Sequence, residues 1–181
     1  IDVPLGHKAP VAQGALGLGG EGEAVPGAGE APEQIPLKKA LMLLKPMLED
    51  PAVLKIGQNI KYDMQVLARH GLAIAPVDDT MLLSYVLDGG LHGHGMDELA
   101  RDFLGYETIK YADVTGTGKA KVTFDQVPVE KALDYAAEDA EVTGRLHGLF
   151  KPRLAAEHMV TVYETLERPL ILILQGMERL G

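Results

Sequence analysis

Leucines recur at three- and four-residue spacing in one stretch of the chain, which is the spacing of an apolar helix face. The stretch begins near Glu33 and stops at Asp50, because the residue before a proline disfavours helical backbone angles. Its apolar positions are Leu37, Leu41, Leu44 and Leu48. Similar spacing predicts further helices over residues 60–70, 80–87 and 97–104, a long helix opening at Pro128, and a last helix over roughly 153–180. The inner stripe of the long helix is predicted to be Leu133, Ala136, Ala137, Ala140, Thr143 and Leu146.

Two short segments are predicted to be strands. Val53–Gly57 is an apolar run suited to a buried strand, and residues 1–5 have the pattern of a short strand at the N-terminal end. Asp79 is placed to cap the helix that follows it, because aspartate accepts hydrogen bonds from the free amides of a first turn. Helices alternating with at least two strands indicate an α/β domain.

Glycine, alanine and proline dominate residues 12–32, which are therefore predicted to be a flexible surface insertion. Gly17–Gly22 matches G-x-G-x-x-G formally, but a dinucleotide loop needs a strand before it and a helix straight after it. Neither is predicted here. Residues 105–127 are predicted to be irregular, and Asp113 and Ala120 occupy positions where a Walker phosphate loop requires glycine and serine or threonine.

Composition narrows the class of protein. The chain has 181 residues, of which 46% are hydrophobic, and this is enough for one domain, or one domain with a tail. It has no cysteine, which excludes disulfides and thiolate zinc sites and fits a cytoplasmic location. Seventeen Lys and Arg against 26 Asp and Glu argue against a general duplex clamp. An acidic chain is compatible with a site where divalent cations meet phosphates. Neither a signal core nor a membrane span is visible, so no membrane partner is expected.

The first candidate site lies in Gly57–Asp63, where a predicted buried strand gives way to a helix. Polar groups that follow a strand in an α/β sheet are well placed to line a cleft. Judged by position alone, Asp63 is a first-turn carboxylate that the helix dipole favours.

The second candidate site lies in Asp134–Asp139. Tyr135 and Asp139 are four residues apart and therefore share one helix face. A carboxylate beside a phenol on an apolar face needs a metal, a water or a donor as its partner. The alternative is an acidic, solvated turn, and Glu138 and Glu141 are expected to be that. His92 and His94 lie between glycines with no third ligand nearby, which predicts a turn rather than a zinc site.

Five segments together resemble a known family. In order they are Ile56–Asp63, Asp79–Tyr85, Met96–Ala100, Val122–Phe124 and Tyr135–Thr143. The chain from about residue 33 to 181 resembles the 3′→5′ proofreading exonuclease domain of bacterial DNA polymerase I, of the DEDD type with a tyrosine. The tail from Tyr163 resembles the segment that leads into the polymerase domain of that family.

This resemblance implies a ribonuclease-H-like α/β fold, with a mixed central sheet flanked by helices, and two-metal hydrolysis of a 3′-terminal phosphodiester. By motif match, Asp63 and Asp139 are metal ligands, and Tyr135 positions the attacking water. Asn59 and Tyr62 match positions that line the substrate site. The expected cofactor is Mg²⁺ or Mn²⁺, because both prefer hard oxygen ligands. The expected partners are the 3′ end of single-stranded DNA and the polymerase domain of the same parent chain.

One element of the family pattern is not found. The first motif, Asp-x-Glu on an opening strand, supplies two of the four metal carboxylates and should lie well before Ile1. Asp2 is followed by Val3 and Pro4 and does not match it. We therefore expect an N-terminally truncated domain that lacks the first strands of its sheet, binds metal weakly and cleaves little or nothing by itself.

The resemblance divides the chain into four parts. They are a residual strand and connection over 1–11, an insertion over 12–32, an exonuclease domain over 33–152, and a helix over 153–181 that leads toward a polymerase domain. Two alternatives remain open from the sequence. One is a ribonuclease D-like RNA exonuclease with the same carboxylate–tyrosine scheme, and the other is a non-catalytic domain that supports a polymerase.

Overall fold

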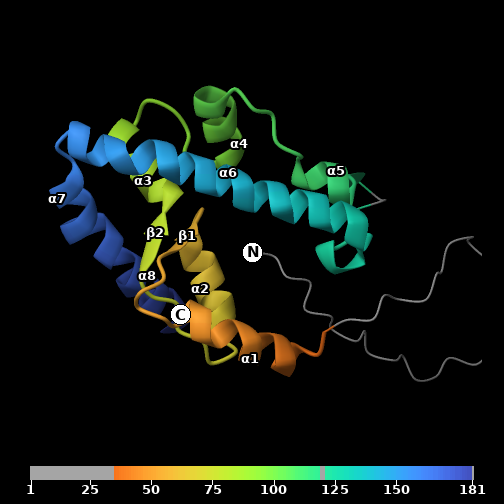
Figure 1. The fold of residues 1–181 in the computed structure, drawn as a ribbon. Coiled ribbons are helices and arrows are strands. Elements are labelled where there is room, and N and C mark those ends of the chain that lie inside the picture. The colour runs from red at the N-terminus through yellow and green to blue at the C-terminus, as the bar shows by residue number, and fades with distance from the viewer. Residues whose placement is uncertain (1–34, 119–120, 181) are drawn as a thin grey trace, which may run out of the picture.

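The chain folds as helices around a small parallel sheet, and the computed structural model describes residues 35–118 and 121–180 (Figure 1). Strand β1 (Lys55–Gly57) runs parallel to β2 (Val77–Asp79), with Ile56 opposite Asp78. This arrangement confirms the α/β class. The helices in chain order are α1 (Leu37–Leu48), α2 (Ile60–Ala68), α3 (Thr80–Asp88), α4 (Met96–Leu99), η1 (Ala100–Leu104), α5 (Tyr111–Thr115), η3 (Phe124–Gln126), α6 (Val129–Ala156), α7 (Val160–Val162), η4 (Tyr163–Glu167) and α8 (Arg168–Leu180).

Most helices lie where apolar periodicity predicts them. Helix α1 ends at Leu48, before the Asp50–Pro51 step, and α2 and α3 occupy the predicted ranges 60–70 and 80–87 to within two residues. The range 97–104 forms α4 followed by the π-helical turn η1. The prediction of an irregular 105–127 is wrong in part, because α5 and η3 form there. The predicted strand over 1–5 and insertion over 12–32 lie outside the described residues.

Strand β2 was not predicted from the sequence. Its residues are Val77, Asp78 and Asp79, and aspartate is depleted in strands because it favours turns and caps. All three residues are nonetheless buried, with Asp78 at 0% and Asp79 at 3% exposure. Burial of two adjacent carboxylates requires that each be hydrogen-bonded or paired, and all but one of the partners described below lie far away along the chain.

The long helix α6 buries a different stripe from the predicted one. Thr143 and Leu146 are buried as expected, but Leu133 is 64% exposed. The stripe is shifted because the helix packs on α3 and β1 through residues nearer its C-terminal end. Its buried positions are Ala132, Val142, Thr143, Leu146, Phe150 and Leu154.

The last helical segment begins later than predicted. Helix α6 continues through Pro152 to Ala156, so the chain from 153 is not yet a new helix. The final segment starts at Val160 and passes through the π-helical turn η4 into α8. Pro169 lies directly after the change from π to α winding, and proline removes one backbone donor there.

Two apolar clusters hold these elements together. One joins α3, α4, α6 and η4, and Leu83, Leu99, Leu146, Phe150 and Tyr163 are fully buried in it. The other joins α1, α2, β2 and α8 through residues that include Leu48, Ile60, Met64, Val77 and Ile171. Leu82 of α3 packs against both clusters. The sheet therefore lies between two packed groups of helices rather than at the edge of one (Figure 1).

None of the helices in the described part of the chain combines the length and the apolar character that a membrane crossing demands.

Candidate functional site

The turn from β1 into α2 carries the first group of predicted site residues. Gly57 ends the strand, and a Cβ at this position would lie 2.8 Å from the Cβ of Ile60, so a larger residue does not fit. Asn59 follows with a φ of 54°. Asparagine tolerates this left-handed conformation better than most residues. Local chemistry thus makes the sharp turn that lets the helix start with only two residues between it and the strand.

Asp63 and Tyr62 lie in the first turn and a half of α2, away from its core face. Ile60 and Met64 of the same helix are buried, whereas Tyr62 is 60% exposed and Asp63 is half-buried. The position near a helix N-terminus favours a negative charge at Asp63. A half-buried carboxylate can bind a metal ion, and an exposed aromatic ring can stack on a nucleotide base.

Tyr135 and Asp139 lie on α6, and both side chains are half-buried. The ring of Tyr135 packs against two others from the preceding segment. Its centroid lies 6.2 Å from that of Tyr111 and 5.7 Å from that of Phe124. These contacts orient the phenol, because a ring held between two neighbours has few rotamers open to it. The structure therefore fixes the residue that motif matching assigns to water positioning.

Glu138 is not the solvated residue that was expected. Its carboxylate accepts a hydrogen bond of 2.6 Å from the hydroxyl of Tyr106 and one of 2.7 Å from the amide of Ile109. The bond to Glu138 raises the pKa of the Tyr106 phenol. Glu141 is exposed, as expected, and pairs at 3.8 Å with Arg145. Glu138 thus ties the loop before α5 to α6, next to Asp139.

Asp79, at the end of β2, contacts the starts of two helices. It caps α3 as predicted, because its Oδ1 accepts a 2.9 Å bond from the amide of Met81. The same carboxylate also accepts bonds of 3.0 Å from the amides of Asn59 and Ile60. Burial raises the pKa of Asp79, and the backbone amide bonds oppose that rise. The contact with α2 could not be predicted from local sequence, since its donors lie 19 and 20 residues earlier.

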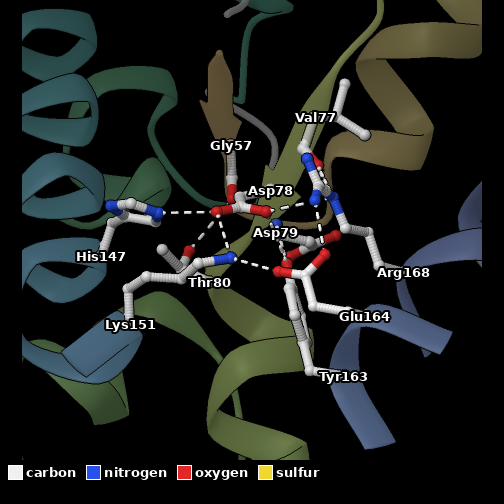
Figure 2. Close-up of polar contacts among 10 residues, drawn as sticks. All are labelled: Gly57, Val77, Asp78, Asp79, Thr80, His147, Lys151, Tyr163, Glu164 and Arg168. Atoms are coloured by element: carbon white, nitrogen blue, oxygen red, sulfur yellow. Dashed lines mark hydrogen bonds and ion pairs between the residues drawn. The ribbon is translucent and has the colours of Figure 1, made fainter. Parts of the chain in front are cut away.

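Asp78 is the centre of a buried ion-pair cluster (Figure 2). His147 Nε2 lies 2.9 Å, Lys151 Nζ 3.0 Å and Arg168 Nε 3.2 Å from its carboxylate oxygens, and the Tyr163 hydroxyl donates to it at 3.2 Å. Burial alone would raise the pKa of Asp78, but the bonds from His147 and Lys151 and the nearby positive charges outweigh it and lower the pKa to about 2. The cluster joins β2 to α6, η4 and α8.

The two aspartates of β2 therefore hold the two helices that carry the candidate site residues. Asp79 contacts the start of α2, which bears Asp63. Asp78 contacts α6 through His147, eight residues after Asp139. Helix α6 also packs directly on β1. Both candidate helices are thus anchored to strand β2.

The donor set fits a hard divalent cation in kind but is incomplete in number. Carboxylate oxygens such as those of Asp63 and Asp139 are the ligands that Mg²⁺ and Mn²⁺ prefer. Within residues 35–118 and 121–180, however, no three histidine or carboxylate side chains converge as a metal site would need. His92 and His94 form no such group either. His94 instead lies 2.9 Å from the Ser84 hydroxyl, as expected for a structured turn.

Comparison with known proteins identifies relatives over most of the chain. Residues 20–155 match the family described as 3'-5' exonuclease. DNA polymerase I of Rhizobium leguminosarum is 51% identical over 99% of this chain, and that of Pseudomonas aeruginosa is 46% identical over 83%. The chain spans only 16% and 17% of the length of these two relatives.

Solved structures share the fold. Brucella melitensis NrnC superposes with a TM-score of 0.64 at 22% identity, over 76% of this chain and 64% of that one. Brucella melitensis NrnC with bound Mg²⁺ gives a TM-score of 0.62 at 24% identity, over 77% of this chain and 64% of that one.

Proposed function

This chain belongs to the 3′–5′ exonuclease family, and we propose that it removes nucleotides from the 3′ end of single-stranded DNA as the proofreading part of a DNA polymerase I. The observation that carries the proposal is the placement of the family's residues on two anchored helices. Asp63 lies on α2, and Tyr135 and Asp139 lie one turn apart on α6. The polymerase relatives at 51% and 46% identity favour DNA replication and repair as the setting.

Asp63 and Asp139 are the proposed ligands for Mg²⁺ or Mn²⁺. Divalent cations bound by carboxylates lower the pKa of bound water and stabilise charge on the attacking and leaving oxygens of a phosphodiester. Both aspartates are half-buried, so their charges are screened less by solvent than those of fully exposed residues. Their part in the reaction is to hold the cations at fixed positions relative to the scissile bond.

Tyr135 is proposed to orient the attacking water. Its ring is held by Tyr111 and Phe124, so its hydroxyl keeps a constant direction relative to Asp139, one turn further along α6. A fixed hydroxyl lowers the entropic cost of aligning water with phosphorus. Asn59 and Tyr62 are proposed to contact the terminal nucleotide, because the exposed ring of Tyr62 offers a stacking face beside Asp63.

The 181-residue chain is proposed to bind metal weakly and to cleave little by itself. By motif match, Asp63 and Asp139 correspond to two of the four carboxylates of the family's site. Loss of ligands removes the preorganised charge on which phosphoryl chemistry depends. A chimera that places the family's Asp-x-Glu strand before residue 1 is then expected to restore activity.

The test is Mg²⁺-dependent shortening of 5′-labelled single-stranded DNA by the chain and by this chimera. Stepwise loss from the 3′ end by the chimera, falling at least about 100-fold in Asp63→Ala and Asp139→Ala, is the expected result. Asp102→Ala, which changes an exposed carboxylate, serves as the control. Equal rates in all variants would exclude the assigned ligands. An RNA strand of the same sequence tests the ribonuclease D-like alternative, and preference for it would overturn the DNA assignment.

A further inference from the structure

Asp79 lies outside the residues assigned to the reaction, yet it contacts the helix that carries one of them. We propose that Asp79 is a positioning residue that fixes the position of Asp63. From strand β2, it supplies the N-terminal cap that helix α2 lacks. The inference rests on the proposed role of Asp63 as a metal ligand. Asp79 itself touches neither metal nor substrate in this assignment.

The geometry of the contact is that of a helix cap. The Asp79 carboxylate accepts 3.0 Å bonds from the amides of Asn59 and Ile60, one to each oxygen. These amides are among the first of α2, which have no partner within a helix. The side chain of Asn59 makes no capping bond to the helix that it precedes. Asp79 therefore satisfies donors that the local sequence of α2 leaves open.

Burial makes this contact rigid. Asp79 is 3% exposed, and Ile60, which donates to it, is 4% exposed. The Asp79 amide also donates a 3.1 Å bond to the hydroxyl of Tyr163, which is fully buried. Asp79 is thus held through both its backbone and its side chain. The position of β2 therefore determines where α2 starts.

Asp63 follows Ile60 by three residues, less than one helical turn, so any shift of the capped amides moves its carboxylate directly. Residues that orient a metal ligand without touching the metal change metal affinity by roughly 10- to 100-fold when replaced. The capped turn also includes Tyr62. A single buried carboxylate therefore sets the position of two candidate site residues together.

The substitution Asp79→Asn separates the two caps that this residue makes. Whichever way the new side-chain amide is turned, its NH₂ group replaces one of the two oxygens. At least one of the backbone amides of Asn59 and Ile60 then faces a donor instead of an acceptor. Asparagine remains a good N-cap, so α3 keeps its start. Asp79→Ser is the second variant: it retains one oxygen for the Met81 amide and is used if the first variant does not fold.

The control is Asp88→Asn. Asp88 is a half-buried carboxylate at the other end of α3 that accepts bonds of 2.8 and 2.9 Å from Arg153 of α6. Its replacement removes a tertiary ion pair of comparable kind without contact to α2. A loss of metal binding caused only by general loosening would appear in this variant as well.

The experiment titrates Mn²⁺ into the ¹⁵N-labelled 181-residue chain and follows paramagnetic broadening of the amides around Asp63. We expect half-maximal broadening in Asp79→Asn to require about tenfold more Mn²⁺ than in the unaltered chain. Amide exchange at Ile60, whose acceptor Oδ2 is replaced when Oδ1 keeps the bond from Met81, should accelerate in Asp79→Asn. Asp88→Asn should leave both readouts unchanged.

Each other outcome has one meaning. Faster exchange at Ile60 with unchanged Mn²⁺ dependence would overturn the positioning role and leave Asp79 as a structural cap. An equal loss of affinity in Asp88→Asn would overturn it too. Absence of broadening near Asp63 both in the unaltered chain and in the chimera that carries the Asp-x-Glu strand would instead overturn the proposed function on which the inference rests.

Discussion

Nε2 of His147 lies 2.9 Å from Oδ2 of Asp78, and this contact joins the long helix α6 to a strand 69 residues earlier in the chain. Lys151, one turn further along α6, approaches the same oxygen at 3.0 Å. Two nitrogen groups on one helix face, the imidazole of His147 and the ammonium of Lys151, thus contact a carboxylate that is 0% exposed. Because these contacts link α6 to the sheet, removing the charge of Asp78 should lower the stability of the fold.

The fold should lose stability in acid through Asp78. Its pKa is about 2 in the folded protein, against an ordinary value of 3.8. Because the folded value is the lower one, the stabilisation is complete above the ordinary pKa and disappears as the pH falls from about 4 to about 2. The shift corresponds to about 2 kcal/mol of unfolding free energy. Urea unfolding between pH 2 and 7 measures it.

The control variant for this acid effect is Asp78→Asn, whose side chain cannot ionise. At pH 7 the variant should be less stable by at least about 2 kcal/mol, because the half-buried Lys151 and Arg168 lose the carboxylate that compensates their charges. Its stability should vary less with pH between 4 and 2 than that of the unaltered chain. The same pH slope in both proteins would show that other carboxylates account for the acid loss.

The core prediction concerns Phe150, which is fully buried in the cluster between α3 and α6. Phe150→Ala should lower the unfolding free energy by about 3–5 kcal/mol, since it removes apolar burial and leaves a cavity. Its neighbour Leu149 is 38% exposed, and Leu149→Ala should cost less than about 1 kcal/mol. Thermal and urea unfolding of the two variants, measured side by side, check the ranking. Equal losses of unfolding free energy in the two variants would mean that Phe150 does not lie on the packed face of α6.

Local pattern was sufficient for most of the helices and for the cap that Asp79 makes on α3. The apolar repeat that ends at Leu48, and the cap that Asp79 makes on α3, involve residues close together in sequence. Such interactions follow from helical spacing and from aspartate chemistry alone. The motifs around Asp63 and Tyr135 are also contiguous, so the family could be identified from them.

Strand β2 and its contacts could not be predicted, because their stability comes from residues far away. Asp78 is tolerable inside the fold only with His147 and Tyr163, which lie 69 and 85 residues further along the chain. Neither hydrophobic spacing nor strand propensity carries information about such a long-range pairing. Glu138 was misjudged for a similar reason, since its donors lie in a loop about 30 residues earlier, at Tyr106 and Ile109.

Glu138 is expected to hold that loop against α6. Glu138→Gln keeps the side-chain shape but weakens two hydrogen bonds, and it should cost about 1–2 kcal/mol of unfolding free energy. The carboxylate raises the pKa of Tyr106. The pKa of Tyr106 should therefore fall toward its ordinary value in the variant, which NMR of ¹³C-labelled tyrosine measures directly. An unchanged pKa for Tyr106 would mean that the hydroxyl does not depend on this bond in solution.

Tyr135→Phe is expected to separate chemistry from folding at the candidate site. The variant keeps the ring contacts with Tyr111 and Phe124, so we expect it to stay folded, which urea unfolding checks. In the chimera that carries the Asp-x-Glu strand, the rate of 3′-end shortening should fall by about 10- to 100-fold, because the attacking water loses its orienting group. Mn²⁺ broadening near Asp63 should persist, since the proposed metal ligands Asp63 and Asp139 are unchanged. Tyr85→Phe, at an exposed ring on α3, should change neither rate nor stability. A Tyr135→Phe rate equal to that of the chimera itself would remove Tyr135 from the mechanism and leave water positioning to another group.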